Sequence, residues 1–481
     1  MIVFLAAAAL AQDDPPTDAP PAAPPSEDPR DADIFGAPAA EDPRDADIFG
    51  ASTSDVPPVA APPVDAGLPG GALRTDAEIA AAIATQDRRF VIGGLAFLRA
   101  QADFVEGASA GAATLGAPSF FDLYGDARPN DRIRFYTRGR LYHDPTVLPD
   151  EVDFVGDPVP QTRVVLDQMW LNTDIARKVF VTIGRQRVRW GVGRLWNPTD
   201  FLAPSALDSL AVFDERLGVS LVKLHVPFEK TGTNLYFVGD LEGASRVDAV
   251  GGALRVEQIV GPGEIALSGE VRKDNPQELG AQASFPLGPL DLKGEVAVRH
   301  GVTTPFWTGS YDIATLQVPT EVSRKDDWIP QALVGAELGI RYSSEDTMFL
   351  GVEYLWNEPG YSDASLYPWL LTQGQFVPFY LGQHYVAAYV LLSGLGPSDE
   401  LTLTATGLSN LSDRSGIARV DGSVRVLTEL TVNGYGQVSL GETGGEFAFG
   451  LDIEPIPGLL EDGLVVPRPV ALVGAGAQLR F

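Results

Sequence analysis

Arginine is the residue type whose spacing first suggests chemistry in this sequence. Arg185, Arg187 and Arg189 occupy alternate positions in the stretch KVFVTIGRQRVRWGVGRLWNPTDFLAP, which covers residues 178–204. Because successive side chains of a β-strand point to opposite faces, this spacing predicts a strand over 178–190 with guanidinium groups on one face. The Gly, Pro, Asn and Asp residues that follow predict a loop.

A second group of alternating residues lies earlier in the chain and comprises Arg132, Arg134, Tyr136, Arg138, Arg140 and Tyr142. Guanidinium groups bind carboxylates and phosphates through paired hydrogen bonds, so two such strands would attract anions. Acidic residues dominate later segments, as at Glu264, Glu270, Asp291, Glu295, Glu337 and Glu353. An alternative interpretation is that the arginines pair with acids such as Asp167 and brace the wall. The arginines outnumber such local acids, which favours anion attraction.

Residues suited to hydrolytic or metal chemistry are sparse. The chain has 4 His and no Cys. Its Gly-x-Ser-x-Gly match at residues 107–111, GASAG, lies between two predicted strands and not before a helix, and no His-Glu-x-x-His pattern occurs. We therefore expect no catalytic site, no metal site, no cofactor and no enzymatic activity. The formal net charge of -29 disfavours nucleic acid as a partner, since a polyanion needs a basic surface.

From Phe90 to the C-terminus the chain consists of alternating segments separated by turn residues. In one of them, apolar and charged positions alternate through Leu290, Asp291, Leu292, Lys293, Glu295, Val296, Val298 and Arg299. We count about eighteen such segments of roughly ten residues each. One apolar and one charged face suits a membrane-spanning barrel, but alternation also suits a soluble β-sandwich.

Three further features favour the barrel. The chain ends ALVGAGAQLRF, with Phe481 last, which resembles the C-terminal strand of bacterial outer-membrane β-barrels. Aromatic residues lie at segment ends, as interfacial belts require. Short and long connections alternate, the long ones being 143–161, 191–215, 301–330, 358–383 and 441–469. Segment 446–453 is placed in the last long connection to preserve this alternation.

The resemblance implies an all-β, transmembrane, antiparallel up-and-down barrel in the bacterial outer membrane, with about eighteen strands and sixteen also possible. The arginines would then face the lumen, because a lipid-facing Arg at the midplane costs about 2–4 kcal/mol. Phe481 would be the assembly signal read by the barrel-assembly machinery, and outer-membrane lipid would surround the barrel.

The pattern Gly-Arg-Gln…Trp-Gly…Asn-Pro-Thr-Asp is similar to one in porin-like and alginate-export-like barrels. This similarity implies passage of small polar, anionic solutes or an acidic polysaccharide through a lumen lined by Arg132, Arg134, Arg138, Arg140, Arg185, Arg187 and Arg189. It also implies that the third outer loop folds inward and narrows the pore with Trp196, Asn197, Pro198, Thr199 and Asp200.

The N-terminal region has a different composition. Residues 1–11 predict a signal peptide and export, because an apolar run ends in a small-x-small pattern. Residues 12–72 form an acidic tail rich in Pro and Ala, which predicts disorder. A capping pattern predicts a short helix over 73–88, before a barrel over 89–481.

The tail contains the unit EDPRDADIFG twice. Its Ile34-Phe35 and Ile48-Phe49 pairs could anchor a periplasmic partner, and two copies would gain avidity. The other interpretation is a duplication without a function. An alternative function follows: a plugged, anchoring barrel whose repeat binds an envelope partner.

Overall fold

The computed structural model describes residues 90–151, 158–202, 210, 216–302, 304–312, 317–343, 346–396, 400–453, 455 and 464–481. The expected signal peptide, the tail with its repeated motif and the expected helix over 73–88 lie outside the described residues. In the part of the chain that is described, no helix is long and apolar enough to cross a membrane.

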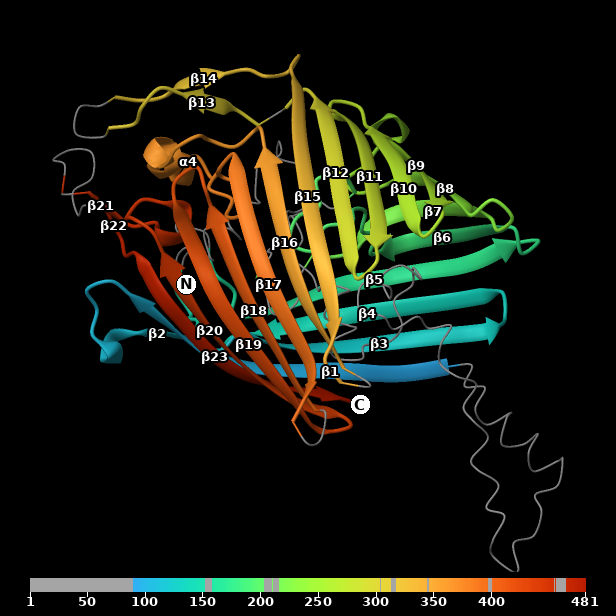
Figure 1. Cartoon of the computed structure of the whole chain (residues 1–481), viewed down its shortest axis with the longest axis horizontal. Coiled ribbons are helices and arrows are strands. Elements are labelled where there is room, and N and C mark those ends of the chain that lie inside the picture. The colour runs from blue at the N-terminus through green and yellow to red at the C-terminus, as the bar shows by residue number, and fades with distance from the viewer. Residues whose placement is uncertain are drawn as a thin grey trace, which may run out of the picture.

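Eighteen antiparallel strands form one closed sheet (Figure 1). The first nine are β1 (Phe90–Val105), β3 (Ser119–Asn130), β4 (Ile133–His143), β5 (Thr162–Ile175), β6 (Val179–Gln186), β7 (Val219–Phe228), β8 (Thr233–Asp240), β9 (Gly251–Val260) and β10 (Gly263–Val271). The other nine are β11 (Gln277–Leu287), β12 (Leu290–His300), β15 (Trp328–Arg341), β16 (Thr347–Asn357), β17 (His384–Leu395), β18 (Leu401–Asn410), β19 (Ser415–Leu427), β20 (Leu430–Leu440) and β23 (Pro469–Arg480). Each strand pairs with the next, and β23 pairs with β1, so the predicted barrel is confirmed with eighteen strands rather than sixteen.

The long connections gather at one end of the barrel, which we call the outer end (Figure 1). The connections at this end contain β2 (Thr114–Gly116), which pairs with β1, and also β13 (Phe306–Thr308), β14 (Thr320–Val322), α4 (Tyr367–Thr372), β21 (Leu451–Ile453) and β22 (Leu464–Val466). They also contain the short 3₁₀ helices η2 (Ala110–Ala112), η3 (Val247–Ala249), η4 (Ala364–Leu366) and η5 (Glu446–Ala448). As predicted, segment 446–453 belongs to the last long connection and not to the barrel sheet.

The two faces of the sheet differ in the way that the alternation predicts. On β4, Phe135 and Leu141 are exposed on the outer surface of the barrel, whereas Arg138 and Arg140 on the other face are buried. An apolar outer surface with polar groups inside is the arrangement that a barrel needs in lipid.

The terminal residue closes the seam between β1 and β23. The backbone N–H of Phe481 donates to Gly94 O at 3.2 Å, and Gly94 N–H donates to Phe481 O at 3.0 Å. The ring of Phe481 lies against Gly94 and stacks on Phe121, with centroids 5.7 Å apart. A side chain at residue 94 would occupy the space of this ring, so glycine is required there for packing.

One expected strand is shorter than predicted. Pairing over 178–190 ends at Gln186, shortly after Gly184, whose φ of 124° departs from extended backbone. Arg187 and Arg189 therefore follow the strand, and the prediction that they share a strand face with Arg185 is wrong. Beyond Gln186 the chain leaves the sheet, so side chains no longer alternate between its faces.

The seam gives a first test. We expect Gly94→Val to lower the thermal stability of the barrel by about 1–3 kcal/mol, because the new side chain displaces the Phe481 ring. The measurement is the temperature at which the folded band is lost on an SDS gel. Gly436→Val on β20 is the control, since a Cβ at residue 436 meets no atom within 4 Å. Equal melting of the two variants would contradict the role of the seam.

Candidate constriction of the barrel lumen

The connection between β6 and β7 crosses the inside of the barrel. It leaves the wall at Gln186 and its residues 192–199 contact β12 and β16. In the sheet, β12 is separated from β6 by β7 to β11, so the chain reaches a distant part of the wall. We call residues 187–202 the crossing loop.

Glu295 of β12 holds the middle of the crossing loop. Its carboxylate is buried and accepts hydrogen bonds from Val192 N–H at 2.6 Å and Gly193 N–H at 2.7 Å. It also accepts from the Thr199 hydroxyl at 2.8 Å and from Thr199 N–H at 3.2 Å. Hydrogen bonds to a charged group contribute about 1.5–3 kcal/mol each, so this carboxylate is a strong attachment point.

Glu353 of β16 holds the next two residues of the loop. Its carboxylate accepts from Arg194 N–H at 2.5 Å and Leu195 N–H at 2.9 Å. Together, Glu295 and Glu353 satisfy the consecutive backbone N–H groups of residues 192–195. The sequence predicted these glutamates only as part of an acidic wall, because no local pattern indicates which distant amides they bind.

The predicted constriction residues all lie in the crossing loop. Trp196 is fully buried, lies 5.7 Å from the Tyr385 ring and donates its Nε1–H to Phe379 O at 3.3 Å. Pro198 and Thr199 are also buried. The structure therefore brings these residues to the far wall, as the expected inward fold requires.

Asn197 and Asp200 lie where the loop turns back. Asn197 O accepts a hydrogen bond from Asp200 N–H at 3.1 Å. The Asp200 carboxylate accepts from Trp190 N–H at 3.0 Å and from Arg216 at 2.9 Å, so it joins the two ends of the connection. Burial raises the pKa of Asp200, although Arg216 and the Trp190 N–H act in the opposite direction.

The arginines of β4 point inward, and each has a carboxylate partner on a neighbouring strand. Arg140 pairs with Asp122 at 2.6 Å, and both side chains are buried. Arg134 pairs with Asp126 at 3.0 Å and lies over the Trp170 ring. Arg138 pairs with Asp167 of β5 at 2.5 Å. These contacts match the salt-bridge interpretation of the arginines, with acids supplied by both adjacent strands.

Asp167 connects this wall to the crossing loop. It lies where the register between β4 and β5 shifts, and it is completely buried. Besides Arg138 it pairs with Arg187 at 3.0 Å, near the start of the connection. It also accepts from Gly218 N–H at 3.3 Å, at the end of the connection. One carboxylate thus pairs with two guanidinium groups and joins both ends of the connection to β5.

The other predicted arginines lie apart from this group. Arg132 is in the turn before β4 and pairs with Asp174 at 3.0 Å. Arg185 pairs with Glu242, in the connection after β8, at 3.2 Å. Arg189 donates to Gly193 O at 2.7 Å, inside the crossing loop. The seven arginines therefore form no single ladder, and six of them pair with five carboxylates, so the expected excess of cations stays a prediction.

Comparison with known proteins gives a likeness in structure alone. Two engineered variants of the porin from Rhodopseudomonas blastica align at TM-scores of 0.39 and 0.40, with 12% and 11% sequence identity. A third structure, titled "Asymmetric conductivity of engineered proteins", aligns at 0.38 with 11% identity. Each alignment covers 82% of this chain and 100% of the other. No family model and no curated protein matches the chain.

These TM-scores are low, so the fold assignment is based on the strand pairing itself. The sheet is closed, its outer surface is apolar, and a loop crosses its lumen. The chain folds as a closed antiparallel β-barrel of eighteen strands. The described part of the barrel contains no group of three or more His, Asp or Glu side chains placed to hold a metal ion.

Outer loops of the barrel contact the crossing loop. Phe379, whose carbonyl accepts from Trp196, donates its own N–H to the Glu446 carboxylate. Glu446 also accepts from the Tyr385 hydroxyl at 2.6 Å and from Asn410 at 2.7 Å. This buried carboxylate therefore joins the last outer loop to the connection 358–383 and to two strand ends.

Glu446 has acidic and phenolic neighbours. Its backbone N–H donates to Asp413 at 2.8 Å, and Tyr367 contacts Asn410 at 3.2 Å. Burial is the largest cause that raises the pKa of Glu446, to about 8, and the Asp413 charge acts in the same direction. Sequence reasoning missed Glu446, because its partners are distant in the chain.

The first test of the site concerns the two attachment points. We expect Glu295→Ala combined with Glu353→Ala to release the crossing loop, because five backbone N–H groups lose their acceptors. Single-channel recordings should show larger and noisier conductance. Asp291→Ala, on the same face of β12, is the control because its partners are Ser284 and Lys293. Unchanged conductance in the double variant would contradict the assignment.

The second test concerns Glu446. Since its pKa rises from 4.5 to about 8 on burial, the loop packing is most stable below 4.5, weakens as the pH rises to about 8, and then stays constant. We expect amide exchange at Phe379, corrected for intrinsic rates, to increase over this range. Glu446→Gln should flatten the profile, whereas Asp452→Asn on exposed β21 should not. A flat native profile would refute this linkage.

Proposed function

We propose that the porin-like barrel is a channel for small polar solutes, with the crossing loop as its constriction. The attachment of one loop to separate parts of the wall supports this proposal. Asp167 holds the ends of the connection on β5, while Glu295 and Glu353 hold its middle on β12 and β16. A loop fixed at both sides narrows a lumen without depending on its own stiffness.

The proposed solutes include anions and segments of acidic polysaccharide, because guanidinium groups line one side of the lumen. Their carboxylate partners lie 2.5 to 3.0 Å away on β3 and β5. We therefore expect only a weak anion preference in the native protein. The strength of this anion preference should depend on the charge of Asp167, since this carboxylate pairs with both Arg138 and Arg187.

We further propose that the barrel lies in the bacterial outer membrane, surrounded by lipid. Phe481 is proposed as the residue by which the assembly machinery recognises the chain. The repeat with Ile34-Phe35 and Ile48-Phe49 is proposed as the binding motif for a periplasmic partner.

A plugged, anchoring barrel is the second candidate. The observation that favours it is the cluster of buried side chains where the crossing loop meets the wall, among them Trp196, Phe379, Tyr385 and Phe447. No single-channel steps in planar bilayers, even after deletion of residues 12–72, would favour this candidate over the channel.

The charge balance at Asp167 gives the test of the channel. We expect Asp167→Asn to remove the negative charge that Arg138 and Arg187 share, and thereby to increase the anion-to-cation permeability ratio several-fold, measured from the reversal potential in a KCl gradient. Asp174→Asn, which unpairs Arg132 in an exposed turn, is the matched control and should change selectivity little. Ohmic steps with identical selectivity in all three proteins would contradict the proposed role of Asp167.

A further inference from the structure

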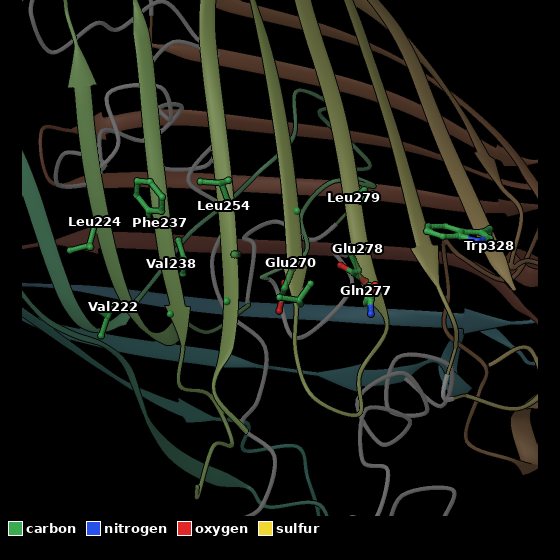
Figure 2. A pocket seen from close by; sticks show the side chains of 15 residues that line it. Val222, Leu224, Phe237, Val238, Leu254, Glu270, Gln277, Glu278, Leu279 and Trp328 are labelled. Atoms are coloured by element: carbon green, nitrogen blue, oxygen red, sulfur yellow. The ribbon is translucent and has the colours of Figure 1, made fainter. Parts of the chain in front are cut away.

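A groove of about 600 Å³ lies on the outer surface of the barrel over β7 to β11 (Figure 2). Its lining is mostly apolar and includes Val222, Leu224, Phe237, Leu254, Val271 and Leu279, with Trp328 at one end. Glu270, Gln277 and Glu278 contribute where β10 and β11 approach the outer end. In a membrane barrel this surface faces lipid, so an occupant of the groove must be largely apolar.

The floor of the groove consists of glycines on three adjacent strands. Gly239 of β8 is paired directly with Gly252 of β9, and Gly269 follows on β10. A Cβ at Gly252 would meet no atom within 4 Å, and one at Gly239 only Val222 O at 4.0 Å. Neither glycine has a positive φ. Packing and backbone conformation therefore do not require glycine at these two positions, and the missing side chains leave open space for an occupant.

The groove lies at the level where lipid headgroups are expected. Trp328 is 58% exposed beside it, and tryptophan prefers the membrane interface. Gly239, Gly252 and Val271 lie within two residues of the outer ends of their strands. A chain lying in the groove would thus have its polar end beside the connections 241–250 and 272–276.

Two exposed cations lie on these connections. Arg246 and Lys273 share the carboxylate of Asp248, at 3.1 and 2.6 Å. Their side chains are 76% and 55% exposed, so an anionic headgroup can reach them. Asp274 adds a negative charge to the turn that contains Lys273. We therefore expect this pair of cations, and not the whole outer end of the barrel, to attract an anionic headgroup.

Arg272 and Glu242 already have other partners. Arg272 pairs with Asp240 at 2.9 Å, and Glu242 pairs with Arg185. The cations available to a headgroup are therefore Arg246 and Lys273. Because these two side chains share one carboxylate, they keep spare hydrogen-bond donors.

We propose that the groove binds one acyl chain of an anionic membrane lipid, whose headgroup contacts Arg246 and Lys273. The inference depends on the membrane placement in the proposed function but not on conduction through the lumen. Apolar contact supplies the binding of the chain, and the two cations supply the preference for an anionic headgroup.

The test uses the full-length protein in detergent, stripped of lipid and mixed with phosphatidylglycerol or with phosphatidylcholine of the same chains. Native mass spectrometry counts the lipid that remains bound. We expect tighter retention of phosphatidylglycerol by the native barrel. Gly239→Leu combined with Gly252→Leu should fill the groove and reduce retention of both lipids by roughly tenfold. Arg246→Ser combined with Lys273→Ser should remove the headgroup preference alone.

Gly139→Leu on β4 is the matched control. Residue 139 shares the outer face of β4 with Leu141, a Cβ there would meet only Val165 O at 3.8 Å, and it does not line the groove. Folding of every variant is checked by its shift on an SDS gel. Unchanged retention and preference in the charge variant would overturn the proposal, even where the filled groove fails to fold. A barrel that retains lipid through the groove but does not conduct would overturn the channel and leave this inference standing.

Discussion

A chain that leaves a β-sheet to cross a barrel lumen must find new acceptors for its backbone N–H groups, and this requirement governs the interior of the protein. A buried N–H without an acceptor costs about 1–3 kcal/mol. Glu295 and Glu353 supply acceptors for residues 192–195 from strands far around the sheet. These two wall residues therefore fix the position of the crossing loop. The position of the loop in turn determines the shape of the proposed pore.

Beside the arginines of β4, a single carboxylate likewise accepts from several donors. Asp167 serves Arg138 and Arg187 and also accepts from Gly218 N–H. A buried pair is weak evidence for net stability, because desolvation opposes the attraction, but losing one partner leaves a buried charge uncompensated. These ion pairs therefore contribute more to the specificity of the contacts in the lumen than to the net stability of the fold.

The outer surface follows a different rule. Side chains on that surface must be apolar to face lipid, but they have no specific partner, so many apolar residue types fit at each position. Gly239 and Gly252 depart from this pattern by presenting open space instead of a side chain. At the seam, by contrast, Gly94 makes room for a group of the chain itself, the ring of Phe481. Glycines on one surface thus have separate physical causes.

The sequence by itself determined the all-β barrel and the inward face of β4, because the period of two of a strand is a local property of the chain. It left eighteen and sixteen strands both possible, and the resemblance to porin-like barrels implied an inward loop with Trp196 to Asp200. It overestimated the strand that ends at Gln186 and did not identify the partners of the crossing loop. Only the tertiary structure decided those points, because Gly193 and Arg194 meet glutamates 102 and 159 residues away in the chain, and no local pattern records such contacts.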